Sequence, residues 1–386
     1  MTDVGSPKYL MDQSLVVPKE GITITSPLHL AGRVEISGGG PIFLKGEGRI
    51  VVSKNSHVVL RNASIEVSAV KAADGDRPTH MIAVEEGRET SLSFEDSSMV
   101  VDIPYEKDTS SAPWDQPPKY WAVGISRVGA DPANVVRVTV RNTRFINRQA
   151  YAAGALDFWR NAQVVNAAIL KGEIVENEFE NFHGVISVNN MKGFKVSENR
   201  LVRNSFHNIF VSGEGVLIKD NKVYYPGNGT TGDGVTVLGK FVSSKIEGNT
   251  IFVGSCFGVL MRGGELSNFS VERNTIINGV TTAIQIEGAT NKATGVSVKN
   301  NVISGNYGFA ITLLRVEDAT IESNDFSDNA KGFPSQIYVE ESSRVVLNNN
   351  FSAIALTPEW AKGLKLYRSH VKSDDSSFTL PGAHAN

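Results

Sequence analysis

The chain has 386 residues, of which 41% are hydrophobic and 20% are charged, and its formal net charge is −3. It is too apolar for a disordered protein, and its near-neutral charge argues against nucleic-acid binding as the main function. No apolar run approaches the roughly 20 residues of a membrane helix. Cys256 is the one cysteine, so neither an internal disulfide nor a thiolate metal cluster can form.

The N-terminal sequence MTDVGSPKYLMDQS lacks the charged and apolar regions of a signal peptide. We expect a secreted or periplasmic protein whose signal peptide is absent from this sequence. Residues 1–27 are predicted to form an N-terminal segment or cap, residues 28–352 the body of the fold, and residues 353–386 a C-terminal cap.

An asparagine recurs in one short phrase, as in VENEF, VSENRL, IKDNKV and VERNTI, about every 25 residues, a period typical of solenoid proteins. Apolar residues two apart flank each phrase, which indicates short strands. Asparagine tolerates a left-handed bend, and its amide can bond to neighbouring coils. We therefore expect a stacked ladder formed by Asn142, Asn177, Asn199, Asn221, Asn249, Asn274, Asn301, Asn324 and Asn350.

A second repeated segment supplies another strand to each coil. GALDFWRN and HGVISVNN align with Leu156 and Val185 at one inward position, and with Phe158 and Ser187 two residues later. The two repeats together predict an all-β, single-domain, right-handed parallel β-helix of about ten to twelve coils with an asparagine ladder.

The longest interruption of the repeat is the segment 101–121, VDIPYEKDTSSAPWDQPPKYW, which contains Trp114. Pyranose rings stack on aromatic side chains, so such a loop beside a long sheet suits a sugar polymer. These aromatic residues could equally anchor the loop on the body. A second candidate loop, residues 224–234, contains Tyr225.

One column of residues stands two positions before the inward apolar position, where a turn becomes a strand. Down the chain it reads His80, then Tyr120, where we take the preceding insertion to shift the spacing by one residue, and then His183, His207 and Asp233. Strict alternation would point these side chains inward, where imidazoles and a carboxylate are costly unless paired. A residue at the start of a strand can also leave the alternation. We expect the last three to form an exposed cluster, and a satisfied structural network is the alternative.

The chain resembles the pectate-lyase-like superfamily of right-handed β-helix carbohydrate enzymes over about residues 28–352. GDGVTV at 232–237 is similar to the Asn-Thr-Asp-Gly-Ile motif of polygalacturonase-type hydrolases, and FHGVISV at 182–188 resembles their Gly-His-Gly-Ile-Ser-Ile motif. Arg262 stands where that family carries the Lys of an Arg-Ile-Lys motif. The resemblance implies that the column containing Asp233 is the catalytic one.

The order of the column differs from that family, which has a carboxylate, a carboxylate pair and then a histidine. An inverting hydrolase needs two carboxyl groups ~6.5–9.5 Å apart, and no other acid stands one coil from Asp233 in the column. A β-elimination fits better, with His183 and His207 as base and acid, Asp233 orienting an imidazole, and Arg262 holding a carboxylate. We therefore expect a polysaccharide lyase that cleaves an acidic, uronate-containing glycan or exopolysaccharide.

Substrate binding is assigned to residues of the same strands and of the two loops. Arg160 and Lys240 can hold uronate carboxylates, and Tyr225 can donate to the leaving group. The full expected set is Asp157, Trp159, Arg160, Asn208, Tyr225, Lys240 and Trp114.

Several alternatives stay open. We expect no cofactor, because the clustered acids of calcium-dependent lyases are not seen; two histidines and an aspartate could still hold a transition metal. The expected partner is a polysaccharide, with neither nucleic acid nor membrane, and the protein is expected to be a monomer. A C5-epimerase, a glycoside hydrolase, and a noncatalytic glycan-binding or structural β-helix resembling a tailspike or adhesin are the other functions.

Overall fold

The structure is a computed structural model of the 386 residues. It describes all of them except 1, 5–7, 72–78, 105–117, 127–130, 132, 159–167, 225–231, 253, 255, 278, 280, 327–335, 351–363, 368, 370 and 374–386. The chain forms two compact units, Met1–His207 and Asn208–Asn386, called unit 1 and unit 2 below. Within the described ranges every element is a strand, and no helix is long and apolar enough to cross a membrane.

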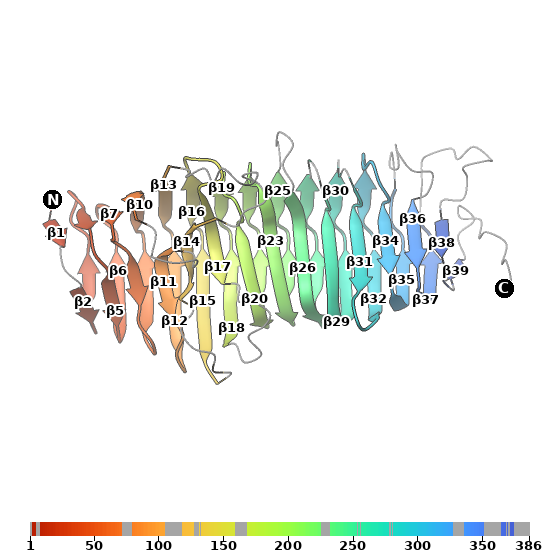
Figure 1. The fold of residues 1–386 in the computed structure, drawn as a ribbon, viewed down its shortest axis with the longest axis horizontal. Coiled ribbons are helices and arrows are strands. Elements are labelled where there is room, and N and C mark those ends of the chain that lie inside the picture. Colours follow the sequence, from red (N-terminus) through yellow and green to blue (C-terminus); the bar gives the residue numbers. More distant parts are fainter. Residues whose placement is uncertain are drawn as a thin grey trace. The chain divides into compact units, whose positions relative to one another are not determined.

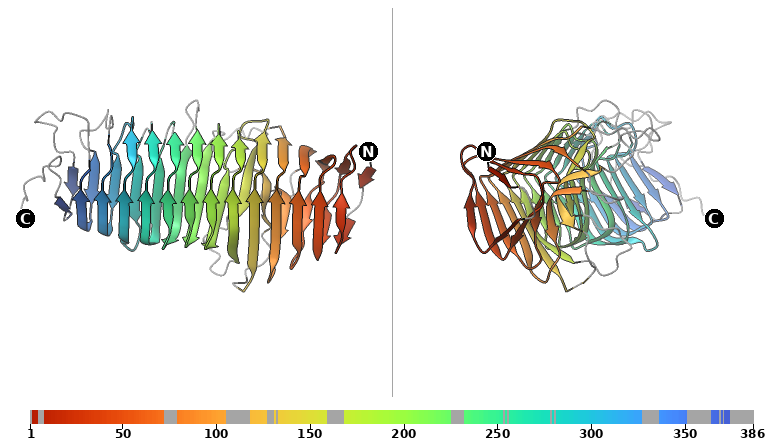
Figure 2. Two further views of the ribbon diagram at one scale, coloured as in Figure 1. Left: turned by 180° about the vertical axis from the view of Figure 1, so that it is seen from behind. Right: turned by 60° about the vertical axis from the view of Figure 1, so that its left-hand side comes forward.

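Each unit is a parallel β-helix in which a coil contributes up to three strands (Figure 1). In unit 1, one coil consists of β11 (Thr79–Glu85), β12 (Thr90–Glu95) and β13 (Ser98–Asp102). Strand β11 pairs in parallel with β14 (Tyr120–Ser126), and β14 with β17 (Ala153–Phe158). Equivalent strands thus stack into three rows, which Figure 2 shows from behind.

The remaining strands of unit 1 follow the same order. The first row also contains β2 (Lys8–Met11), β5 (Leu28–Ala31), β8 (Ile50–Val52) and β20 (Ile186–Lys192), and β23 (Phe206–Glu214) begins in unit 1 and ends in unit 2. The second row also contains β3 (Ser14–Val16), β6 (Arg33–Ser37), β9 (His57–Arg61), β15 (Val135–Arg141), β18 (Ile169–Val175) and β21 (Lys195–Ser197). The third row also contains β1 (Thr2–Val4), β4 (Ile22–Ile24), β7 (Pro41–Gly46), β10 (Ser64–Val70), β16 (Arg144–Asn147), β19 (Glu178–Glu180) and β22 (Arg200–Val202).

Unit 2 has the same three rows, and β29 (Val259–Glu272) runs through the first and the second. The first row also contains β26 (Gly232–Val242), β31 (Ile284–Gly288), β34 (Ile311–Leu314), β36 (Ile337–Glu340) and β38 (Leu364–Tyr367). The second row also contains β24 (Leu217–Lys219), β27 (Lys245–Glu247), β32 (Ala293–Lys299), β35 (Val316–Glu322), β37 (Ser343–Asn348) and β39 (Val371–Ser373). The third row contains β25 (Lys222–Tyr224), β28 (Thr250–Phe252), β30 (Thr275–Ile277) and β33 (Val302–Ser304).

The core of each unit lies between the rows and is filled by alternate residues of the strands. In unit 2 the predicted inward position is confirmed, because Val235, Val259, Ile284, Ile311 and Ile337 stand opposite one another and are fully buried. β-branched and other aliphatic side chains repeat at this position, so each coil adds its own apolar layer.

The predicted asparagine ladder is confirmed. In unit 2 the backbone N and the Nδ2 of Asn221 both donate to the Oδ1 of Asn249, at 2.9 Å. The same two bonds join each later member to the next, and in unit 1 they join Asn177 to Asn199. Each amide is buried and satisfied by its neighbours, as a coil corner in a core requires. The unit 2 ladder consists of Asn221, Asn249, Asn274, Asn301, Asn324 and Asn350.

Asn142, which we predicted to belong to this ladder, lies outside it. Its side chain is exposed, and the ladder position is taken by Thr143, whose backbone N donates to the Oδ1 of Asn177 at 2.9 Å. The physical reason is the register of the following strand, in which Phe145 stands opposite Phe179. Asn142 stands three residues before Phe145, whereas Asn177 stands two residues before Phe179.

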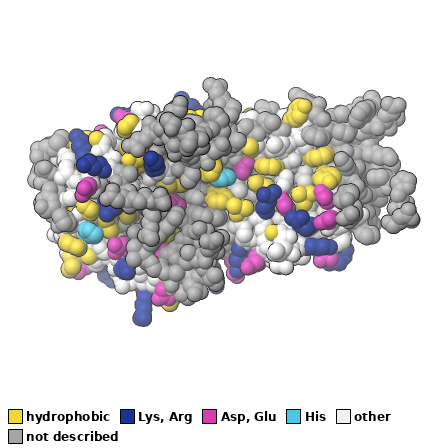
Figure 3. Space-filling model, viewed as in Figure 1, with side chains coloured by type: hydrophobic (Ala, Val, Ile, Leu, Met, Phe, Trp, Pro, Cys, Tyr) yellow, Lys and Arg dark blue, Asp and Glu magenta, His cyan; other side chains and the backbone are white. Residues whose placement is uncertain are grey.

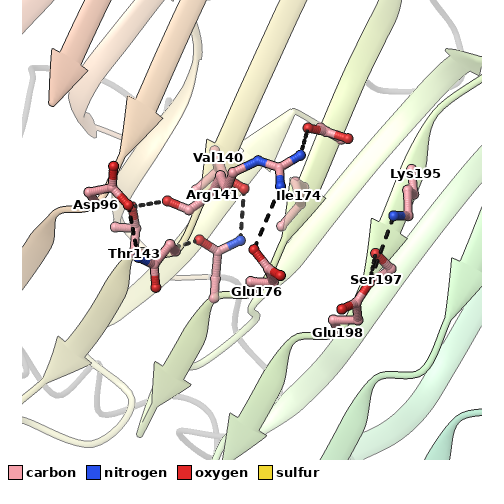
Figure 4. Close-up of polar contacts among 12 residues, drawn as sticks. Asp96, Val140, Arg141, Thr143, Ile174, Glu176, Lys195, Ser197 and Glu198 are labelled. Atoms are coloured by element: carbon pink, nitrogen blue, oxygen red, sulfur yellow. Dashed lines mark hydrogen bonds and ion pairs between the residues drawn. The ribbon is translucent and has the colours of Figure 1, made fainter.

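Exposed ion pairs follow the outer side of the corner in unit 1 (Figure 4). Arg141 pairs with Glu176 at 3.6 Å, and Lys195 with Glu198 at 3.8 Å. The hydrogen bond that Arg141 donates to the carboxylate of Glu173 raises the pKa of Arg141. Because these groups are solvated, each pair adds little to the free energy of unfolding.

We expect Asn249→Ala to lower the free energy of unfolding by roughly 2–5 kcal/mol, because buried groups of Asn221 and the carbonyl of Ile218 would lose their partner. Chemical denaturation followed by circular dichroism measures this loss. The control is Asn291→Ala, which removes one exposed bond to the carbonyl of Gly264 and is expected to cost no more than about 0.5 kcal/mol. Equal losses in the two variants would contradict a stabilising ladder.

Candidate functional site

His80 lies on the outer side of the first row of unit 1. In β17, Asp157 stands between the core residues Leu156 and Phe158, and therefore faces outward. Gly124 of β14 stands opposite Asp157, and a Cβ built on this glycine would lie 2.2 Å from the Cδ2 and 2.5 Å from the Nε2 of His80. The imidazole thus lies over Gly124, so this member of the predicted column leaves the strand alternation.

The imidazole of His80 and the carboxylate of Asp157 form a buried pair, here called the dyad. Nε2 and Oδ2 are 2.9 Å apart, and the two side chains are 6% and 5% exposed. The ring reaches from β11 past β14 to β17. This is possible only because residue 124, between the two, is a glycine and has no side chain. An ionised carboxylate can only accept, so Nε2 carries the hydrogen and donates it. No other described residue hydrogen-bonds the side chain of His80.

Trp121 stands opposite His80, where we predicted Tyr120. The prediction assumed that the preceding insertion shifts the register by one residue, whereas the register continues unchanged through both strands. A Cβ built on Gly154 would lie 2.4 Å from the indole, and one built on Gly184 3.0 Å from it. The buried indole therefore covers two glycines of the next coils and ends beside Gly184.

His183 stands opposite Ser205, and not opposite His207 as the predicted column required. Its Nδ1 is 2.8 Å from the Oγ of Ser205, and the residue is 1% exposed. The rings of Tyr151 and Phe206 flank the imidazole, with centroids at 5.6 and 5.2 Å. The hydrogen bond to Ser205 and the contacts with the two aromatic rings help to fix this side chain.

A bulge at His183 changes the register that we predicted for the following strand. The backbone N of His183 donates to the carbonyl of Ala153, but the N of Ala155 donates to the carbonyl of Gly184, which has a φ of 83°. The bulge inserts one residue. Leu156 therefore stands opposite Ile186 and not Val185, and Phe158 opposite Val188 and not Ser187.

His207 is half-buried, and its ring centroid lies 4.2 Å from that of Phe206. Phe206 therefore contacts both imidazoles, so the structure does bring His183 and His207 into one cluster. Phe206 and Tyr151 have φ angles of 69° and 64°, a region that costs a bulky residue about 1–2 kcal/mol. Strain of this kind is concentrated at functional sites.

In unit 2, Asp233 is buried within a network of hydrogen bonds. Its Oδ2 accepts from the Oγ1 of Thr236 at 2.8 Å, and its Oδ1 from the backbone N of Phe257 at 3.2 Å. Asn208 donates through Nδ2 to the carbonyl of Asp233 at 3.1 Å. These bonds fix the start of β26, and they satisfy a carboxylate that is 7% exposed.

Arg262 and Lys240 already have carboxylate partners in unit 2. Arg262 lies 2.8 Å from Glu287, which also contacts Arg315 at 2.9 Å, and Lys240 lies 3.4 Å from Glu214. Figure 3 shows Lys and Arg side chains next to Asp and Glu side chains on the face of the molecule that it views. More than half of the Arg262 side chain is exposed, so it can contact a further anion.

Four predicted binding residues, Trp114, Trp159, Arg160 and Tyr225, lie outside the described residues. Asp157 is described, and it contacts His80, which we had not assigned a role. Among the residues that the structure describes, no group of three or more His, Cys, Asp or Glu side chains is arranged to hold a metal ion.

A family model described as a right-handed β-helix region matches residues 289–384. The fold is thus a right-handed parallel β-helix, as the sequence predicted. A search of curated protein sequences gave no match.

Several solved structures are similar at low identity. The A-module of the mannuronan C-5 epimerase AlgE6 of Azotobacter vinelandii is 15% identical, with 88% of this chain and 91% of that chain covered and a TM-score of 0.49. A PL6 alginate lyase in complex with a trisaccharide is 11% identical, with 94% and 78% covered and a TM-score of 0.44. The surface protein and adhesin PfbA of Streptococcus pneumoniae is 11% identical, with 89% and 92% covered and a TM-score of 0.35. Likenesses this distant assign no activity.

We expect Gly124→Ala to break the dyad, because the added methyl group would occupy the place of the His80 ring. The free energy of unfolding should fall by about 1–3 kcal/mol, measured by thermal denaturation. In the control Gly264→Ala, the new methyl group would meet only the Oγ1 of Thr290, at 3.2 Å, which can rotate away. A Gly124→Ala variant as stable as the control would show that the imidazole does not lie over this glycine.

Proposed function

We propose that the protein is a polysaccharide lyase that cleaves a uronate-containing glycan by β-elimination. The observation that carries the proposal is the cluster of His183, Phe206 and His207 on unit 1, in which two imidazoles contact one strained aromatic residue. Imidazoles take up and release protons near neutral pH, as removal of the acidic C5 proton of a uronate requires.

His207 is the proton acceptor in this proposal, because its half-buried ring can reach a substrate. His183 is held by Ser205 and keeps Phe206 and the neighbouring imidazole in place. The side chains of Tyr151, Phe206 and His207 are all partly exposed, and they offer aromatic surface for a sugar ring.

Arg262 is proposed to attract a carboxylate of the glycan through the exposed part of its guanidinium group. Asp233 is included because the motif GDGVTV resembles a catalytic motif of hydrolases. The proposal assigns no cofactor, a glycan as the partner, and action outside the cytoplasm.

Noncatalytic glycan binding is the second candidate, and the 1% exposure of His183 favours it, since a buried imidazole serves packing as readily as chemistry. A panel of uronate glycans incubated in ²H₂O distinguishes the functions. A lyase gives unsaturated products that absorb in the ultraviolet, an epimerase gives deuterium at C5 without absorbance, and a binding protein gives neither. If Asp233→Asn abolished a release of reducing ends that occurs without absorbance, hydrolysis would replace elimination.

We expect His207→Asn to lower the rate of elimination by about 10²–10⁴-fold, the usual contribution of a general base. Asparagine is smaller than histidine but stays polar at this half-buried position, so the melting temperature should stay close to that of the wild type. His57→Asn is the matched control, because this exposed histidine contacts Ser91 in the second row. Equal activity of the two variants would exclude His207 as the base.

Arg262→Gln should raise KM for the glycan about tenfold, the equivalent of roughly 1.4 kcal/mol, with little change in kcat. Steady-state kinetics at low salt measures this effect, since salt screens exposed charges. The control is Arg344→Gln, another exposed arginine of unit 2 with acidic partners, Glu317 and Asp318. If KM rose equally in both variants, the effect would be one of net charge and not of a binding site.

A further inference from the structure

The dyad of His80 and Asp157 has no role in the function proposed above. Burying two ionisable groups costs solvation free energy that a single ion pair seldom recovers, so an apolar pair of similar size would stabilise the fold as well or better. The dyad also needs Gly124, since any side chain there would displace the ring. These costs point to a use beyond packing.

We propose that His80 is a catalytic residue that donates a proton to the leaving oxygen, and that Asp157 is its positioning residue. This inference rests on the proposed function. Asp157 fixes the ring and keeps the hydrogen on Nε2, which leaves Nδ1 as the nitrogen that exchanges a proton with the substrate. A histidine oriented by a carboxylate in this way is a recurrent arrangement in proton transfer.

The dyad stands on the same row of strands as His183 and as His207, the proposed base, which lies one coil beyond His183. The Cα atoms of His80 and His183 are three coils apart, roughly 14 Å. The His80 ring spans much of this separation, because it passes Gly124 and reaches the coil of Asp157. The coil of Asp157 comes directly before that of His183. Along the strand direction, Asp157 and the position opposite His183 are about three residues apart, on the order of 10 Å. Trp121 lies between the two histidines, where its indole ends beside Gly184.

Elimination needs one proton acceptor and one proton donor. His207 takes the C5 proton, the C4–C5 double bond forms, and the bond between C4 and the glycosidic oxygen breaks with its electron pair on oxygen. Protonated His80 gives its Nδ1 proton to this oxygen and becomes neutral, while the other hydrogen stays on Nε2 and is still donated to Asp157. Water restores both imidazoles, so no further reactant is needed.

The test compares His80→Asn and Asp157→Asn with Ser187→Ala, a control that removes the partly exposed hydroxyl opposite Asp157. Cleavage and exchange of the C5 proton are measured on one sample of uronate glycan in ²H₂O. We expect His80→Asn to lower cleavage about 10²–10⁴-fold while C5 exchange persists, because the base is intact and the departing proton donor is missing. Asp157→Asn should act in the same direction, and Ser187→Ala should change neither signal.

Unchanged cleavage in His80→Asn would overturn the inference, and so would loss of cleavage and exchange together in a variant that melts at the wild-type temperature. A purely structural dyad would lower the melting temperature and leave the ratio of the two signals unchanged.

A second measurement needs no turnover. Diethyl pyrocarbonate acylates an accessible neutral imidazole, and peptide mass mapping should find His80 modified in the wild-type protein, more slowly when polyuronate is present. Absence of modification would contradict a proton donor that a substrate can reach. If His80 reacted but no glycan were cleaved, the proposed function would be wrong, and the donor role with it, although the dyad would remain a reactive group.

Discussion

Parallel backbone pairing between successive coils is the constraint on which the other features of each unit depend. It sets every residue opposite its equivalent in the next coil, so a residue type that repeats in sequence becomes a continuous stack in space. The asparagine amides bond to one another at about 2.9 Å for this reason, and the inward aliphatic residues form one core. The same pairing brings Gly124 opposite Asp157 and leaves the outer space that the imidazole of His80 fills.

The repeat made the fold predictable, because strand period, corner residue and coil length all agree with a β-helix. The site was harder to predict, since one inserted residue shifts every later contact. Ser205, and not His207, stands opposite His183, because Phe206 is an extra residue in the next coil: Gly184 N donates to the carbonyl of Ser205, but Val185 N donates to that of His207. Equal spacing within two segments cannot reveal such an extra residue, which depends on the local backbone, as at Phe206 with a φ of 69° and at Gly184 with a φ of 83°. The extra residue before Phe145 displaced Asn142 from the ladder in the same way.

The dyad could not be predicted by aligning equivalent positions of successive coils. Its two members occupy different positions in the coil and lie 77 residues apart in sequence. His80 belongs to the column at the start of the strands, whereas Asp157 occupies the outward position three residues further along. A signal was nevertheless present in the glycine of WAVGISR, which stands outward in β14 where a side chain would otherwise cover the sheet. A histidine one coil before such a gap can lie across it.

Charge is used differently on the two units, and this bears on how an acidic glycan could be bound. In unit 2, Arg262 and Lys240 are balanced by Glu287 and Glu214, so that face attracts an anion only through the unpaired parts of its cations. In unit 1, the dyad is enclosed, and its electrostatic interactions are stronger for lack of water. Taken by itself, the exposed face of unit 2 suits a polymer, because weak attraction lets a chain slide. Taken by itself, the buried pair of unit 1 suits an interaction with one sugar, because its two side chains are fixed. A small monosaccharide would gain nothing from the exposed face, which is why we argue for a glycan.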